Sequence, residues 1–294
     1  MAIEFLETGD KELLQRIART PAACFLAAHS RRVSTSGDGP GAGELVVQLL
    51  TSSTVSDVDP EGIRIRLSLM QTESEAYLRC WNETAAYLPS GALSGAVLYL
   101  TVGYDIGVAM DGQASLNLAH QHFAANPGEL LFYAVHELHH VGYQKYNPLP
   151  IMTDIRTTSD LADLIRCLAA MEGQAVHAVR RWRTEAGAKE TDSDYVALLD
   201  PQRMAVYEKE FFRLYRSLAE VDPRPLEGKD WGILERMSAG DRLWYRVGAL
   251  IADRIERELG RQVLIETIVQ GPEAFFGRYA ELSAKSWGDP GKLE

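Results

Sequence analysis

The spacing of hydrophobic residues predicts helices over most of the chain. Apolar side chains recur every three or four positions, which is the spacing that buries one face of an amphipathic helix. Asp10 can cap the first of these helices, because its carboxylate can accept a hydrogen bond from the first turn. Helices are predicted for residues 11–20, 21–33, 61–88, 127–141, 161–186, 201–219 and 241–259.

The hydrophobic pattern changes in the middle of the chain. Residues 95–104 are rich in β-branched and aromatic side chains and predict a buried strand. Residues 105–112 read as a glycine-bearing loop, and residues 115–123 alternate apolar and polar positions as in a half-exposed strand. The predicted fold class is therefore mainly α (α+β), helical with a small β-sheet directly ahead of helix 127–141.

Three regions follow from this order of elements. They are a helical N-terminal region (1–92), a core with the strands and two polar helices (93–190), and a helical C-terminal region (191–294). A chain of 294 residues can form one large domain or two small ones, so the three regions could also be one integrated domain.

Charge and composition limit the partners. The net charge of −11 argues against a nucleic-acid partner, which would require clustered Lys and Arg. The three cysteines lie far apart without a C-x-x-C pair, so they indicate neither a disulfide framework nor a thiolate zinc site. Neither a signal peptide nor an apolar stretch of about 20 residues is present, so we expect a cytoplasmic protein with no membrane partner.

The helix at 127–141 contains the segment HELHH, residues 136–140, which matches H-E-x-x-H. His136 and His140 are one helical turn apart, so both imidazoles can reach one cation. Glu137 is rotated by about 100° from His136, so its carboxylate lies beside the cation and can take a proton from the attacking water. The pattern fits one catalytic zinc ion per chain, although H-E-x-x-H also occurs by chance. His139 points elsewhere and is expected beside the site or at the surface.

A third ligand is needed, because two histidines do not hold a catalytic zinc ion. The metzincin class is excluded, because Tyr143 and Tyr146 stand where that class has a glycine and a histidine. Glu172 lies within the apolar stripe of helix 161–186, where a carboxylate is costly unless it is paired or coordinated. We favour a metal ligand over a buried ion pair with Arg or Lys. The adjacent Gly173 would let another helix approach closely.

H-E-x-x-H on one helix, followed about thirty residues later by EGQA (172–175) on another, resembles the gluzincin metallopeptidases. More narrowly it resembles the peptidase-MA-like group of zinc-dependent peptidases, over residues 95–180. The resemblance implies a zincin-like fold with His136, His140 and Glu172 as zinc ligands and Glu137 as general base and acid. It also implies that the strand before the active helix, at residues 115–120, binds the substrate backbone.

The chain departs from the gluzincin pattern in two ways. Val176 stands where many gluzincins have an aspartate, and the segment VAMDG (108–112) lacks the glutamate of the aminopeptidase signature, so an aminopeptidase is not indicated. Such enzymes use a downstream Tyr or His to stabilise the oxyanion, and Tyr245 is the candidate, with plain core packing as the alternative. His120 and His122 could line the substrate cleft, help to bind a metal, or belong to an exposed edge strand.

These features predict a zinc-dependent metallopeptidase that hydrolyses peptide bonds in a peptide or protein substrate. Two alternatives remain open at this point. One is a non-catalytic zincin-fold protein that binds a peptide or protein, and the other is a metal-dependent hydrolase of a non-peptide amide. The intact Glu137 favours an enzyme, because a binding protein has no need of that carboxylate.

Overall fold

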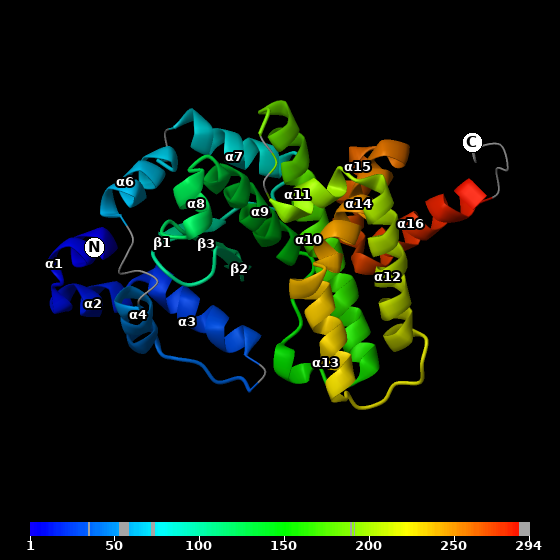
Figure 1. The fold of residues 1–294 in the computed structure, drawn as a ribbon, viewed down its shortest axis with the longest axis horizontal. Coiled ribbons are helices and arrows are strands. Elements are labelled where there is room, and N and C mark those ends of the chain that lie inside the picture. Colours follow the sequence, from blue (N-terminus) through cyan, green and yellow to red (C-terminus); the bar gives the residue numbers. More distant parts are fainter. Residues whose placement is uncertain (35, 53–58, 72–73, 189, 191, 288–294) are drawn as a thin grey trace. The chain divides into compact units, whose positions relative to one another are not determined.

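The computed structural model describes residues 1–294 except 35, 53–58, 72–73, 189, 191 and 288–294 (Figure 1). The chain divides into two compact units. The first comprises Met1–Thr84, Leu93–Gly142 and Ile151–Thr153, and the second comprises Ala85–Ala92, Tyr143–Pro150 and Asp154–Glu294. Within the described residues, no helix is both long and apolar enough to cross a membrane.

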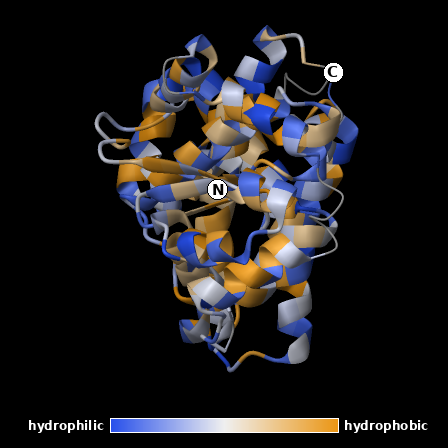
Figure 2. Ribbon diagram, turned by 90° about the vertical axis from the view of Figure 1, so that its left-hand side faces the viewer, coloured by the Kyte–Doolittle hydropathy of each residue, from blue (hydrophilic) through white to orange (hydrophobic). Residues whose placement is uncertain are grey.

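The first unit combines short helices with one small sheet. Its helices are α1 (Ala2–Thr8), α2 (Lys11–Ala18), α3 (Pro21–Val33), α4 (Ala42–Thr51), α6 (Pro60–Leu69), α7 (Glu75–Ala85), α8 (Gln121–Ala125) and most of α9 (Glu129–Gln144). Helix α2 begins where its polar cap predicts, since the Asp10 side chain accepts a hydrogen bond from the Glu12 amide. In Figure 2 the helices carry both hydrophobic and hydrophilic residues, as amphipathic helices do.

The sheet has three strands in the order β1-β3-β2, namely β1 (Val97–Thr101), β2 (Gly107–Met110) and β3 (Gln113–Asn117). β1 pairs with β3 in parallel, with Val97 opposite Gln113, and β2 pairs with β3 antiparallel, with Met110 opposite Gln113. The prediction of a loop at 105–112 is therefore wrong. Asp111 and Gly112 both have positive φ, 51° and 80°, and make the tight turn that joins β2 to β3.

Other predicted elements differ as well. The half-exposed strand predicted over 115–123 is wrong beyond Asn117, because β3 (Gln113–Asn117) is mostly buried and residues 121–123 belong to helix α8. The helix predicted over 61–88 is two helices, because the Ser74 side chain bonds both the Leu69 carbonyl at the end of α6 and the Tyr77 amide at the start of α7. The helix predicted over 127–141 is α9, which starts at Glu129 and runs through Gly142 to Gln144. Gly142 does not end it. A mainly helical chain with a small sheet just before the polar helix is confirmed.

The second unit is helical. Its elements are α10 (Thr158–Glu185), α11 (Ser193–Leu198), α12 (Pro201–Ala219), α13 (Gly228–Glu235), a π-helical turn η2 (Arg236–Gly240), α14 (Leu243–Leu259), α15 (Arg261–Gln270) and α16 (Pro272–Trp287). A short 3₁₀ turn, η1 (Met152–Asp154), precedes α10. The domain ranges 1–92, 93–190 and 191–294 remain a prediction.

Helices α10 and α14 touch along their backbones, and they can be followed side by side in Figure 1. A Cβ atom added to Gly173 would lie 2.1 Å from the carbonyl carbon of Gly248, and one added to Gly248 would lie 2.1 Å from the Ala169 oxygen. Only glycine at both positions permits this approach. The close approach expected at Gly173 is thus observed, and α14 is its partner.

Candidate metal centre

The two histidines of HELHH share one face of α9. Their ring centroids are 4.4 Å apart and their planes are inclined at 80°. The opposite side of the helix is fixed by packing, since Leu130, Ala134 and Leu138 are completely buried. Because these apolar side chains set the rotation of α9, the histidines are held on one side of the helix with His136 half-buried and His140 buried.

Glu137 lies against the edge strand of the sheet. Its side chain is 5% exposed, and a Cβ atom added to Gly107 at the start of β2 would come within 2.7 Å of its Oε1 atom and 2.8 Å of its Cδ and Cγ atoms. The sheet packs on the same helix, because Val141 joins Ala109 and Ala114 in one apolar cluster. A carboxylate next to the backbone of an edge strand is well placed to act on a molecule bound along that strand.

Glu172 lies on α10, next to the glycine contact with α14. It is half-buried, as expected for a carboxylate in the inward stripe of that helix. His136, His140 and Glu172 form the one group of three such side chains, among the described residues, that could hold a metal ion. Each offers one ligand atom, and the three atoms lie within 4.8 Å of one another. Two imidazole nitrogens and a carboxylate oxygen are donors that suit zinc.

Tyr245 is on α14, one helical turn before Gly248. Burial and the negative charge of Glu172 raise the pKa of its phenol well above the ordinary value, although the charge of Arg242 opposes them. The phenol therefore keeps its proton throughout the physiological pH range and can act as a hydrogen-bond donor. Tyr245 is only half-buried, so part of its side chain is exposed, which plain core packing does not require.

The residues around Tyr245 were not predicted from the sequence. The guanidinium carbon of Arg242 lies 3.8 Å from the centroid of the Tyr245 ring. Arg242 is held by Asp194, with Nε–Oδ2 and Nη2–Oδ2 distances of 2.8 Å. The sequence carries no signal for this pair, because the burial of Asp194 is visible only in the structure and its partners come from a segment about fifty residues away.

Three other histidines, His139, His120 and His122, are buried or contact other protein side chains and backbone. His139 is completely buried, so a surface position is excluded for it. The Nδ1 atom of His120 accepts a hydrogen bond from the His122 amide and caps α8, and burial lowers the pKa of His120, with the charge of His122 adding to this effect. The Nε2 atom of His122 is 3.6 Å from the buried carboxylate of Glu129. Neither His120 nor His122 belongs to a metal-binding group of the described residues.

The expectation that residues 115–120 bind the substrate backbone is wrong for the strand itself. β3 is the central strand, with β1 on one side and β2 on the other, so its backbone donors and acceptors are already used. β2 is an edge strand. The edge next to Glu137 is therefore formed by residues that the sequence had suggested to be a loop.

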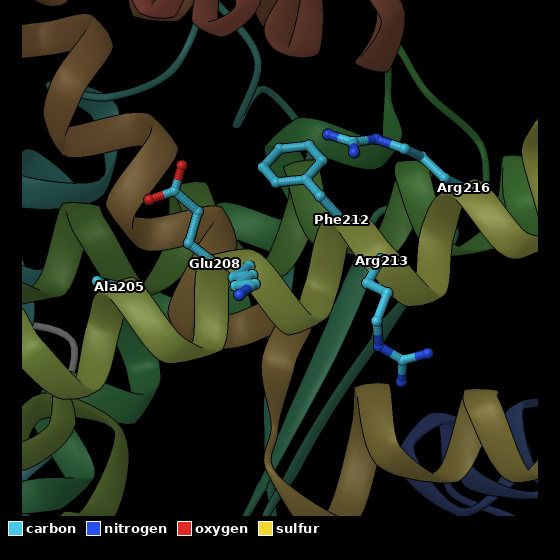
Figure 3. Close-up of a pocket in the computed structure, with 6 residues that line it drawn as sticks. Ala205, Glu208, Phe212, Arg213 and Arg216 are labelled. Atoms are coloured by element: carbon cyan, nitrogen blue, oxygen red, sulfur yellow. The ribbon is translucent and has the colours of Figure 1, made fainter.

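A surface hollow on α12 is unrelated to these residues. It is lined by Ala205, Glu208, Lys209, Phe212, Arg213 and Arg216. Figure 3 shows Glu208, Phe212 and Arg216 on one side of α12 and Arg213 on the other, so these side chains do not converge on a common point. Arg213 is also engaged by Glu210, at 2.7 Å.

The comparisons with known proteins agree with the chemistry of these residues. Residues 62–286 match the model of the family described as "Putative zinc dependent peptidase (DUF5700)". The matched range contains α9, α10 and α14 and all of the candidate residues. Comparison with curated proteins and with solved structures gave no match. The family match supports a zinc-dependent peptidase.

Proposed function

Because the chain belongs to the DUF5700 family, we propose that it is a zinc-dependent peptidase of gluzincin type with a zincin-like fold. In this proposal His136, His140 and Glu172 hold one zinc ion, Glu137 is the general base and acid, and Tyr245 stabilises the oxyanion. The observation that carries the proposal is the group of two imidazoles and one carboxylate whose donor atoms lie within 4.8 Å of one another.

The end of α9 supports Glu172 as the third ligand. The Nε2 atom of Gln144, in the last turn of α9, lies 3.7 Å from the sulfur of Met171, the residue before Glu172. His140 is four residues before Gln144 on the same continuous helix, and His136 is one turn earlier. Gln144 and Met171 are thus in contact within the second unit, one residue before Glu172 on α10.

When bound, a zinc ion would act as a Lewis acid that polarises the scissile carbonyl and makes water acidic near neutral pH. Glu137 would accept the proton of the attacking water and pass it to the leaving amine. Its position beside Gly107 places it next to a substrate held along β2, where it would be close to the group that receives the proton. The phenol of Tyr245 would donate a hydrogen bond to the oxyanion.

The edge strand supports a peptide as the substrate. A peptide can add to a sheet edge by main-chain hydrogen bonds, which do not depend on its sequence. Among the residues that the structure describes, no strand pairs with the outer side of β2, and Gly107 at its start lies against Glu137. We therefore propose that the substrate binds as an extended chain along Gly107–Met110. The net charge of −11 gives no reason to add nucleic acid as a partner.

The first experiment measures metal content by mass spectrometry in the wild-type protein and in Glu172→Ala. We expect about one zinc ion per wild-type chain and a strong reduction in the variant. Absence of zinc from the wild type after zinc is supplied would refute the metal site. Full occupancy in Glu172→Ala would keep the site and remove Glu172 from the ligands.

The second experiment separates a peptidase from the alternatives. A peptide library is incubated with the zinc-loaded wild type and with Glu137→Gln, which retains the shape of the side chain but cannot accept the proton. Cleavage by the wild type alone supports the proposal. Equal binding of peptides by both proteins, with no cleavage by either, would instead indicate a non-catalytic binding protein.

A further inference from the structure

Arg242 has a backbone conformation that its own residue type does not favour. It is the residue before α14 and has φ 48° and ψ 44°, in the left-handed region. A residue other than glycine adopts this region at a cost of about 1 kcal/mol, and such residues are concentrated at functional sites. Its side chain makes no capping hydrogen bond to α14. What holds Arg242 is therefore the ion pair with Asp194.

The ion pair is part of a cluster in which two arginines share one carboxylate, that of Asp194. Asp194 is buried and binds two arginines, since the Nε atom of Arg246 is 2.9 Å from its Oδ1 atom. The other donors of Arg246 are used as well, by the Tyr207 hydroxyl, the Asp241 carbonyl and the Ser193 hydroxyl, in hydrogen bonds of 2.9–3.3 Å. Arg246 is therefore bonded through each of its three guanidinium nitrogens, and Arg242 shares Asp194 with it.

Arg242 also differs from Arg246 in its free donors. Its Nε and Nη2 atoms face Asp194, while its Nη1 atom makes no hydrogen bond to any residue that the structure describes. Its side chain is 36% exposed, compared with 5% for Arg246. One edge of the guanidinium is thus fixed by the protein and another is accessible.

The accessible edge lies close to the candidate site. The guanidinium lies over the ring of Tyr245, at 3.8 Å. Burial lowers the pKa of Arg242, but the negative charges of Asp194 and Glu172 are among the effects that raise it above the ordinary value. Glu172 is therefore near enough to act on Arg242. If Glu172 binds a zinc ion, its charge is neutralised by the metal, and Arg242 then has only Asp194, which it shares with Arg246.

We propose that Arg242 binds a carboxylate of the substrate next to the scissile bond, so that the enzyme prefers peptides with an acidic side chain or a free C-terminus at that position. This inference rests on the proposed peptidase function. Arginine suits the role because its planar fork pairs with a carboxylate through two parallel hydrogen bonds. Asp194 is the positioning residue that holds the fork toward the site.

Binding without turnover tests the inference. Three acetylated tripeptides with two alanines are compared: one ends in glutamate amide, one in glutamine amide, and one in glutamine with a free C-terminus. Their affinities for the zinc-loaded Glu137→Gln protein are measured by calorimetry. We expect one of the two carboxylate peptides to bind roughly tenfold more tightly than the neutral peptide, as a charged hydrogen bond allows. The peptide that shows the gain identifies the source of the carboxylate.

The same measurements on arginine variants assign the effect. Arg242→Gln should abolish the preference for a carboxylate, whereas Arg278→Gln, an exposed arginine of α16 paired with Glu281, should retain it. If Arg242→Gln does not fold, Arg242→Lys replaces it, and the preference should fall at least threefold because an ammonium lacks the planar fork. Equal affinity for all three peptides, or an unchanged preference in the Arg242 variant, would overturn the inference.

Failure of the inference and failure of the proposed function give different results. Cleavage of library peptides by the wild type with no preference for a carboxylate would refute the role of Arg242 and leave the peptidase intact. Carboxylate binding that depends on Arg242, without cleavage of any peptide, would retain the binding site and refute the peptidase.

Discussion

The absence of a side chain at Gly107 leaves the space that the Glu137 side chain occupies. In Gly107→Ala the new methyl group would lie 2.7 Å from Oε1 of Glu137, which is a steric clash. Glu137 is a flexible side chain and can move away, so we expect little loss of stability. The displaced carboxylate should lower kcat by roughly tenfold or more, because proton transfer needs the correct position. Steady-state kinetics and thermal unfolding measure the two effects.

Gly43→Ala is the matched control for Gly107→Ala. Gly43 lies on α4, and a Cβ atom there would meet nothing within 4 Å. Its kcat should equal that of the wild type, and its zinc content should match that of Gly107→Ala. Wild-type kcat in Gly107→Ala would show that Glu137 does not act from the position beside β2.

Tyr245→Phe removes the hydroxyl group and keeps the ring that faces Arg242. If the phenol stabilises the oxyanion, kcat should fall roughly 10²–10³-fold while zinc content and KM stay near the wild-type values. Because burial and Glu172 raise the pKa of Tyr245, its ionisation should not limit the wild-type rate below about pH 10. Tyr146→Phe, at an exposed position, should have wild-type kcat, and equal rates in both variants would exclude Tyr245 from the reaction.

Among single residues, the sequence predicted the relative positions of those that lie on the same helix. The one-turn spacing of His136 and His140 fixes their common face whatever surrounds the helix. The importance of Gly107 and Arg242 depends on contacts with residues thirty to fifty positions away in the sequence. Local spacing contains no information about such contacts, so the sequence did not reveal them.

The crossing of α10 and α14 is the element-level feature that brings Tyr245 near Glu172. In Gly173→Ala the added methyl group would meet the backbone of Gly248 at 2.1–2.3 Å, and backbone cannot rotate away. We expect a loss of stability of about 1–3 kcal/mol from this overpacking, measured by urea unfolding. The helices should also separate, so the rise in the pKa of Tyr245 caused by Glu172 should decrease.

Gly232→Ala controls for the helix propensity of alanine. Gly232 is on α13, and a Cβ atom there would have no neighbour within 4 Å. It should leave the protein as stable as the wild type or slightly more stable. A Gly173→Ala protein with wild-type stability would show that the two backbones are not in tight contact.

Among the elements, long amphipathic helices were predicted well and the sheet was not. The helices at 21–33 and 201–219 have the predicted bounds, because each starts at a proline preceded by a capping side chain. β2 was missed because its four residues contain too few alternations to indicate a strand, and the Asp111-Gly112 turn was read as part of a loop. The break between α6 and α7 depends on hydrogen bonds of a single serine, Ser74.

For the whole molecule, composition and periodicity predicted a mainly helical chain but not the order of its strands. Strand order depends on pairing between segments, and the hydrophobic pattern of one segment does not specify its neighbours. β3 follows β2 directly and was predicted to be half-exposed and to bind the substrate backbone, yet it is the central strand. As a result, the helical pattern was enough to place H-E-x-x-H on α9, whereas the hydrophobic pattern was not enough to identify the edge strand beside it.

Acid stability tests how the second unit is held together. The Glu256 carboxylate on α14 contacts the Nε2 atom of His177 on α10 at 2.5 Å and the Nε atom of Arg261 at the start of α15 at 2.8 Å. Burial alone would raise its pKa, but these two partners lower it from 4.5 to about 2. The folded state therefore binds this proton less readily than the unfolded state does.

The sign of the effect follows from that difference. The contribution of Glu256 to stability is fully present above about pH 5 and is lost as the pH falls from about 4.5 toward 2. We expect the loss to be roughly 1–2 kcal/mol, less than the roughly 3 kcal/mol of the full shift, because solvent partly screens the group. Urea unfolding of the wild type and of Glu256→Gln between pH 2 and 7 measures this loss.

The Glu256→Gln variant should be less stable than the wild type at pH 7 and should lose less stability on acidification. The control Glu266→Gln, at an exposed position of α15, should follow the wild type. Parallel curves for Glu256→Gln and the wild type would mean that the contacts of Glu256 with His177 and Arg261 do not stabilise the folded state.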